Sequence, residues 1–408
     1  MAPRPRATGS GFEPYVWAAT VDEVAARHGL SPAHVLRFDA NVPAFPAPLP
    51  VAAEVALAER GEYPEGSYRA LRSAAADYAG CSPDEVAIDA GADGLIALVA
   101  RTYLSPGALA VVERPTYPLY AIASGIEGAE VRAVPRDLDA LEEAGREASV
   151  VWLCNPGNPS GAMWPAAEIV RLAEALPDTL VAVDEAYFEY GGETVAGANV
   201  VAIRTLSKAF GLAGLRVGYA VAPREVAAEL SARRSPAPIA TTAARIGAAA
   251  LREPQIEAEV TATIAERERV RAALAAAGFD APPVHANFVV ARTPAARELA
   301  ANLERRGLVV RGYADSLRIT VRSPADDDLV LRALGAEPPP SERRSATVLG
   351  AGVRVSLVLD GSGRVTCATG DRELERRARE AGYDLEVVAE PGADVTRALD
   401  EAIERARH

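Results

Sequence analysis

The sequence has 408 residues, 49% of them hydrophobic, and a formal net charge of −13. A chain of this length forms about two or three domains and can bury a sizeable core. The acidic balance argues against nucleic acid or an anionic membrane as the main partner, although it leaves room for a small basic pocket.

Cysteine usage and hydropathy indicate the compartment. The three cysteines lie far apart in the sequence and form neither a CxxC pair nor a cluster with histidine. We therefore expect a reduced, cytoplasmic protein without a metal site. No apolar signal core follows the first residues, and no apolar run reaches the roughly 18 residues of a transmembrane helix, so we expect no membrane partner.

The N-terminal residues 1–45 are interpreted as an arm together with part of a smaller domain. A helix is predicted over 21–28, because Thr20 and Glu23 have the spacing of a capping box. The prolines of 43–50 favour an extended segment. A helix-like pattern then occupies 51–60, and a turn follows at 61–66.

Strands and helices alternate from residue 85 onward. The predicted strands are 86–89, 108–112, 131–134, 150–153, 180–183, 200–203 and 217–221, and the helices between them include 95–103, 138–146 and 165–176. This alternation is typical of an α/β fold with a mostly parallel sheet, and we assign it to a large domain at 46–250. Ligands of such sheets bind at the carboxyl ends of the strands, from which the loops 90–94, 114–118, 154–161, 184–190 and 204–216 emerge.

The remaining sequence predicts a smaller α+β domain and a separate C-terminal module. Residues 251–336 contain helical patterns at 255–277, 295–306 and 325–334, and two short strands at 307–311 and 317–321. The proline-rich 337–344 is a linker by composition. Residues 345–408 are predicted to form two strands, a helix, a strand and a helix.

Lys208 is the residue with the most distinctive surroundings. It follows a buried strand and has small and apolar neighbours, and partial burial favours the neutral amine that attacks a carbonyl to form a Schiff base. Thr205, Ser207 and Arg216 bring hydrogen-bond donors suited to a phosphate. Asp184 ends another apolar strand, where a carboxylate is costly unless it meets a cation or donors.

Three motifs occur in a fixed order: Asn155-Pro-Gly-Asn-Pro-Ser-Gly161, Asp184-Glu-Ala-Tyr187, and a third that runs from Ser207-Lys208 through Gly211, Gly214 and Arg216 to Gly218-Tyr219. Over residues 36–335 the chain resembles the fold-type I aminotransferases that use pyridoxal 5′-phosphate (PLP). The finer pattern, which includes Leu317-Arg-Ile-Thr-Val321, is similar to the histidinol-phosphate aminotransferase branch. The resemblance implies a seven-stranded, mostly parallel sheet in the large domain.

The resemblance also implies roles for individual residues. Lys208 would bond covalently to PLP and carry protons, Asp184 would pair with the pyridinium nitrogen, and Tyr187 would bond the phenolic oxygen. The complete implied cofactor set is Ala92, Asp93, Gly94, Tyr117, Asn158, Asp184, Tyr187, Thr205, Ser207, Lys208, Arg216 and Tyr63. Tyr63 would reach the site of a neighbouring subunit, which implies a homodimer.

Substrate residues are implied at three further positions. Arg318 matches an arginine that clamps the substrate α-carboxylate, Arg311 one near the distal phosphate, and Asn41 a substrate-loop asparagine. Asn41-Val42-Pro43 departs from the motif of the family at that loop. The resemblance implies ping-pong amino transfer between an amino acid or amino-alcohol phosphate and a 2-oxo acid. Decarboxylation, or oxidation or cyclisation of an arginine-like amino acid, stays open as the alternative, as does an idle scaffold.

Residues 343–408 resemble a degenerate fragment of imidazoleglycerol-phosphate dehydratase. The matching pieces are Arg344-Ser-Ala-Thr-Val348, 353–363, 368–370 and 383–387. The only histidine of this tail is His408, so the histidine-rich metal segments of that enzyme are missing and its activity cannot follow. The alternative is an unrelated small module. If the tail is a remnant of that enzyme, it would serve assembly or act as a lid.

Overall fold

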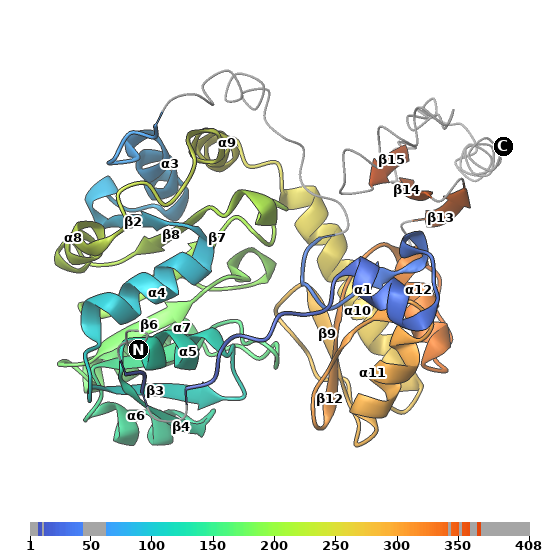
Figure 1. Cartoon of the computed structure of the whole chain (residues 1–408), viewed down its shortest axis with the longest axis horizontal. Helices are drawn as coiled ribbons and strands as arrows, with labels where there is room; N and C mark the ends of the chain where they lie inside the picture. Colours follow the sequence, from blue (N-terminus) through green and yellow to red (C-terminus); the bar gives the residue numbers. More distant parts are fainter. Residues whose placement is uncertain are drawn as a thin grey trace, which may run out of the picture. The chain divides into compact units, whose positions relative to one another are not determined.

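The computed structural model describes residues 7–9, 12–43 and 63–341, and the backbone of three strands between 344 and 368 (Figure 1). The predicted helix at 51–60 and most of the tail lie outside the described residues. Contacts divide the chain into two compact units. The large unit comprises the described parts of Met1–Trp17 and Ala47–Ile256 with Val284–Ala286, and the small unit those of Ala18–Pro46, Glu257–Pro283 and Asn287–His408.

A seven-stranded sheet forms the centre of the large unit. Its strands are β2 (Val86–Asp89), β3 (Leu109–Arg114), β4 (Glu130–Pro135), β5 (Val150–Cys154), β6 (Leu180–Asp184), β7 (Val200–Thr205) and β8 (Gly218–Val221). They are arranged in the order β2-β8-β7-β6-β5-β3-β4, and β8 alone runs antiparallel to both of its neighbours. The predicted mostly parallel α/β sheet is therefore confirmed.

Helices cover both faces of this sheet (Figure 1). On one face lie α4 (Gly91–Tyr103), α5 (Leu119–Ile126) and α8 (Arg224–Arg233), and on the other α6 (Leu138–Gly145) and α7 (Ala166–Ala175). α3 (Arg69–Ala79) packs against α9 (Thr241–Arg252). The central strands β5, β6 and β7 are buried on both faces, which explains why they read as unbroken apolar runs.

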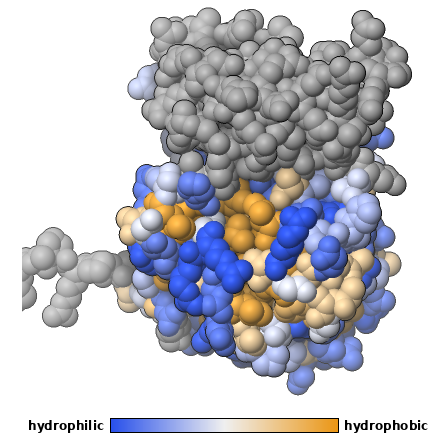
Figure 2. Space-filling model, turned by 90° about the vertical axis from the view of Figure 1, so that its right-hand side faces the viewer, coloured by the Kyte–Doolittle hydropathy of each residue, from blue (hydrophilic) through white to orange (hydrophobic). Residues whose placement is uncertain are grey.

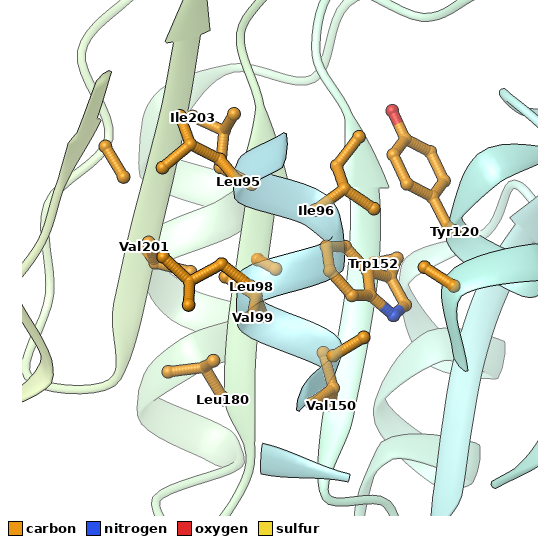
Figure 3. Packing of buried hydrophobic residues seen from close by; sticks show 14 of the residues in the cluster. Leu95, Ile96, Leu98, Val99, Tyr120, Val150, Trp152, Leu180, Val201 and Ile203 are labelled. Carbon is orange, nitrogen blue, oxygen red and sulfur yellow. The ribbon is translucent and has the colours of Figure 1, made fainter. Parts of the chain in front are cut away.

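The core beneath α4 shows how the first face is held. Leu95, Ile96, Leu98 and Val99 are fully buried or nearly so, and they point toward the side chains of Trp152 and the neighbouring strands (Figure 3). Apolar burial of this kind contributes about 25 cal/mol per Å² of apolar surface removed from water. It fixes the start of α4 against the carboxyl edge of the sheet.

One local prediction in the large unit needs correction, and one helix was not predicted. α4 begins at Gly91, so that Ala92, Asp93 and Gly94 form its first turn rather than a loop before residue 95. No helix was expected at α3, whose first residue follows Tyr68, which is in a left-handed conformation with φ 49°. The start of a helix is often recognised in a sequence by a polar residue whose side chain caps it. Tyr68 precedes α3 without such a cap, so the sequence carries no capping signal there.

The small unit is an α+β structure, as predicted. β9 (Phe288–Arg292), β12 (Ser316–Thr320) and β11 (Arg311–Gly312) form an antiparallel sheet, and β1 (Leu36–Arg37) pairs with β10 (Leu308–Val309). Its helices are α1 (Val21–His28), α10 (Glu257–Ala276), α11 (Ala296–Glu304) and α12 (Pro324–Ala333). The predicted capping box of α1 is present, with Thr20 and Glu23 bonding each other's backbone amides.

Three antiparallel strands follow the linker: β13 (Arg344–Gly350), β14 (Val353–Leu359) and β15 (Val365–Ala368). The first two were predicted. β15 was not, because the tail was expected to continue with a helix after its second strand. The predicted helices and final strand of the module lie outside the described residues.

The described surface mixes polar and apolar side chains (Figure 2). Among the residues with described side chains, the large hydrophobic residues that are exposed are Tyr15, Val16, Trp17, Tyr63, Ile126 and Leu329. No helix within the described ranges is both long and apolar enough to cross a membrane.

We predict that Leu95→Ala lowers the free energy of unfolding by about 3 kcal/mol, since it removes a fully buried side chain from a packed core. Ile126→Ala is the control, because Ile126 is half exposed and its truncation costs about 1 kcal/mol or less. Urea denaturation followed by circular dichroism measures both. Equal losses in the two variants would contradict the assignment of Leu95 to the core.

Candidate active site

The chemically active residues of the large unit lie at the carboxyl edge of its sheet. Asp184 ends β6 and Thr205 ends β7, and both face the side of the sheet that α4 covers, in line with Ala182 and Ile203. Side chains alternate between the two faces of a strand. Glu185 directly follows β6, and Arg204 precedes Thr205 on β7. Both therefore belong to the opposite face, where they form a buried ion pair at 2.8 Å.

Asp184 is a buried carboxylate with two donors. Tyr120 donates its hydroxyl to Oδ2 at 2.7 Å, and the backbone N–H of Ala186 donates to Oδ1 at 3.0 Å. Burial raises the pKa of Asp184 to about 6, although the hydrogen bond from Tyr120 and the charge of Lys208 both oppose this rise. A cation beside this carboxyl group would stabilise its charged form.

Lys208 is half-buried and lies in the turn that follows β7. Its Nζ is 5.8 Å from the centroid of the Tyr187 ring, and its charge acts on Asp184. The sequence prediction that Lys208, Asp184 and Tyr187 lie near one another is met by these contacts. Their individual chemical roles stay predictions.

An anion-binding corner lies at the start of α4. Thr205 and Ser207 share a hydrogen bond of 2.9 Å, and Arg216 extends one nitrogen to Ser207 Oγ at 3.4 Å and another to Asp93 Oδ2 at 2.9 Å. α4 has no side-chain cap at its N-terminus. The backbone N–H groups of a helical first turn, with hydroxyls and a guanidinium beside them, are donors suited to a phosphate group.

Glycines make this corner possible. Gly91 has φ 73°, and a Cβ there would lie 2.8 Å from a guanidinium nitrogen of Arg216. A Cβ on Gly218 would lie 2.5 Å from the backbone carbon of Gly91. The start of α4 and the start of β8 therefore approach so closely that side chains at these positions would displace them.

Of the other predicted cofactor residues, Tyr117 contacts this corner. Tyr117 is half-buried and donates its hydroxyl to Asp93 Oδ1 at 3.2 Å. Its ring meets Tyr120 edge-on at 5.8 Å, and Tyr120 stacks on Trp152 at 5.4 Å. Asn158 is half-buried in the loop that follows β5.

The three predicted substrate residues belong to the small unit. Arg318 is buried on β12, donates to the carbonyl of Asp39 at 2.6 Å and lies 5.5 Å from the Phe288 ring. Arg311 is exposed on β11 and is the direct register partner of Arg318. Directly opposed residues of an antiparallel pair share one face of the sheet, so two like charges are adjacent here, an arrangement that costs stability unless an anion joins them.

Asn41 is held within the small unit. It is buried with φ 51°, and its Oδ1 accepts the Thr320 hydroxyl at 2.8 Å while its N–H donates to Thr320 Oγ1 at 3.0 Å. Asn287 donates to its carbonyl at 3.1 Å. These bonds tie Asn41 to β12, the strand of Arg318.

Tyr63 is 94% exposed and lines a cavity of about 430 Å³ in the large unit. The lining also includes Pro64, Glu65 and Tyr68, and Leu71 of α3 and Arg245 of α9. A large aromatic side chain so fully exposed is unusual in a folded chain unless it contacts another molecule.

Sequence reasoning missed one member of the site, Tyr120. Its hydroxyl donates a side-chain hydrogen bond to Asp184. A signal was present, because Tyr120 lies three residues after Tyr117 at the start of an apolar helix and therefore projects near the same face. The sequence neighbours of Tyr120 are apolar, and such surroundings are typical of a core position.

The fold and these contacts define a PLP-dependent transferase. A family model for class I and II aminotransferases matches residues 33–334, and the chain belongs to that family.

Within the family, the chain is an aminotransferase of the histidinol-phosphate type. It is 37% identical to a histidinol-phosphate aminotransferase of Symbiobacterium thermophilum over 80% of this chain and 96% of the relative. A crystal structure of histidinol-phosphate aminotransferase from Sinorhizobium meliloti in complex with PLP superimposes with a TM-score of 0.71 at 30% identity, over 80% of this chain and 96% of that one. An aromatic amino acid aminotransferase of Rhodococcus jostii is 35% identical over 68% of this chain and 82% of the relative.

The residues present fit PLP. The corner formed by α4, Ser207 and Arg216 suits its phosphate, the buried Asp184 suits its protonated ring nitrogen, and Lys208 offers an amine beside them. The glycines at 91 and 218 let the start of α4 approach Arg216 and β8 closely.

We predict that Tyr120→Phe weakens PLP binding at mildly acidic pH. Tyr120 lowers the pKa of Asp184 through its hydrogen bond, so its loss moves the pKa above about 6 and delays formation of the carboxylate. The acidic limb of PLP affinity, measured by absorbance titration between pH 5 and 7, should shift to higher pH. In Asp184→Asn, the control, that limb should vanish, and an unshifted limb in Tyr120→Phe would contradict the prediction.

Proposed function

We propose that the chain transfers the amino group of histidinol phosphate, or of a closely similar amino-alcohol phosphate, to a 2-oxo acid. Two observations support this proposal. Relatives at 33–37% identity bear that activity in their names. The paired arginines Arg311 and Arg318 provide two adjacent positive charges for a doubly charged anion.

The register of this arginine pair is the observation that carries the substrate proposal. A carboxylate needs one guanidinium, whereas a phosphate ester with three oxygens can accept bonds from two. Arg318 is buried and anchored to Asp39, while Arg311 is exposed. Arg318 would hold either class of anionic substrate, and Arg311 would add selectivity for a phosphate.

The residues of the large unit would perform the chemistry. PLP, when bound, supplies an aldehyde for covalent attachment and a ring that accepts the electron pair from the substrate Cα. Lys208 would take the proton from that Cα at its Nζ and return it to the carbon on the other side of the amino nitrogen. Asp184 would hold its negative charge against the ring nitrogen, and Tyr187 and Asn158 would position the phenolic oxygen.

The proposed assembly is a cytoplasmic homodimer in which Tyr63 completes the site of the partner subunit. The exposure of Tyr63 and the cavity beside it support this arrangement. We also propose that the tail, which resembles a degenerate imidazoleglycerol-phosphate dehydratase, serves assembly and no dehydratase chemistry, since His408 is its only histidine.

We predict that Arg318→Gln lowers kcat/KM about 100-fold for both histidinol phosphate and an aromatic amino acid, because either anion loses a charged partner. Arg311→Gln should lower it about tenfold for the phosphate substrate and less than about twofold for the aromatic amino acid. Steady-state kinetics with a common 2-oxo acid measure these values. Equal effects of Arg311→Gln on the two substrates would remove the assignment to a phosphate.

We predict that two inactive variants restore activity when mixed. Lys208→Ala abolishes turnover in its own site, and Tyr63→Ala damages the site of the partner. A mixed dimer then contains one site with both residues intact. Unfolding and refolding the two proteins together should recover about a quarter of wild-type activity, since half of randomly formed dimers are mixed and each has one intact site. Recovery no greater than the sum of the separate variants would argue against a shared site.

A further inference from the structure

A second polar cluster lies behind the cofactor corner, on the opposite face of the sheet. Arg204 donates from Nε to Glu185 Oε2 at 2.8 Å and from a terminal nitrogen to Thr194 Oγ1 at 3.2 Å. Its guanidinium lies 3.5 Å from the centroid of the Phe188 ring. Both charged side chains of the pair are almost fully removed from water.

Glu189 adds a second carboxyl group to this single guanidinium. Arg204 and Glu185 both act on its charge, with opposite signs. Tyr78 from α3 and Tyr219 from β8 complete its surroundings, since the charge of Glu189 raises the pKa of both hydroxyls. The cluster thus contains two carboxyl groups, one guanidinium and two phenols.

One polar atom of this cluster is left without a hydrogen-bond partner. Glu189 Oε2 is buried and has no partner among the described residues. A buried carboxylate oxygen without a donor is costly, whereas a protonated carboxyl group carries no charge and can itself donate. The geometry therefore favours the neutral acid at Glu189, and burial raises its pKa to about 7.

The position of the cluster connects it to the cofactor site. Glu185 directly follows Asp184, and Arg204 directly precedes Thr205. The rings of Tyr78 and Phe210 pack edge-on, with their centroids 5.7 Å apart. Phe210 lies two residues after Lys208 in the sequence. Any shift of Arg204 toward a second carboxylate would move the backbone that carries the cofactor-binding side chains on the other face.

We propose that Glu189 is a positioning residue that must be protonated for tight cofactor binding. Its ionisation, with the proton released to solvent, draws Arg204 from Glu185 and displaces the ends of β6 and β7. Neither the aminotransferase assignment nor the proposed substrate requires this residue.

The test compares the wild type with Glu189→Gln, whose amide imitates the neutral acid, and with Glu174→Gln, an exposed control on α7. PLP affinity is measured by absorbance titration at pH 6.5 and 8. Wild type and control should weaken about eightfold, as expected when only the protonated fraction of a group with pKa near 7 is competent. Glu189→Gln should weaken less than about twofold. If it weakens as much as the wild type, the proposal is wrong.

Thermal unfolding without PLP gives an independent readout. The folded pKa of Glu189 lies above its ordinary value of 4.5, so its stabilising proton is lost as pH rises from about 4.5 to about 7. The Tm of wild type should fall across this range by more than that of Glu189→Gln, and parallel curves would count against the proposal.

Infrared spectroscopy tests the proposal on the wild-type protein, so that no variant has to fold. The protein is labelled with ¹³C at its glutamate carboxyl carbons. A protonated-glutamate band that disappears with a midpoint near pH 7 is expected, and its absence at pH 6 overturns the proposal.

Discussion

The burial of one carboxylate, that of Asp184, is the constraint on which the active site depends. The end of β6 is closed in by α4 and α5, so the carboxylate must be satisfied by groups that those elements supply. Tyr120 of α5 gives one hydrogen bond, and the backbone of Ala186 gives another. The raised pKa shows that these two donors do not offset the whole cost of desolvation. A cationic ring nitrogen would supply the remainder, which links cofactor affinity directly to the packing of the helices.

The two faces of the sheet divide the work at its carboxyl edge. The face toward α4 presents Asp184 and Thr205, to which we assign the chemistry and the phosphate binding in the proposed function. The opposite face buries Glu185 with Arg204, which join the ends of β6 and β7 by a charge pair. Breaking a buried ion pair is costly, because the remaining charge has no partner. The pair therefore fixes the spacing of the strands from which the reactive residues project.

The sequence predicted the sheet well because its central strands β5, β6 and β7 are buried on both faces, whereas the edge strand β4 is partly exposed. It also predicted the convergence of Lys208, Asp184 and Arg216, since loops that leave one edge of a parallel sheet must meet there. It could not place Tyr120, whose contact depends on how α5 packs, or the Glu189 cluster, which joins α3 to three strands. α3 itself was missed because Tyr68 enters it with a positive φ and no capping side chain. Contacts between distant elements leave no local pattern.

The antiparallel direction of β8 has a consequence for how the active site could be altered. Because β8 returns beside β7, one short connection, residues 206–217, carries both Lys208 and Arg216. A parallel strand there would have required a long crossover with a helix. The proposed covalent anchor and the proposed phosphate ligand thus lie on one short connection, whose length limits how far apart they can be. Lengthening this connection would uncouple the two, and a protein engineer who wished to admit a different coenzyme would have to begin at this hairpin.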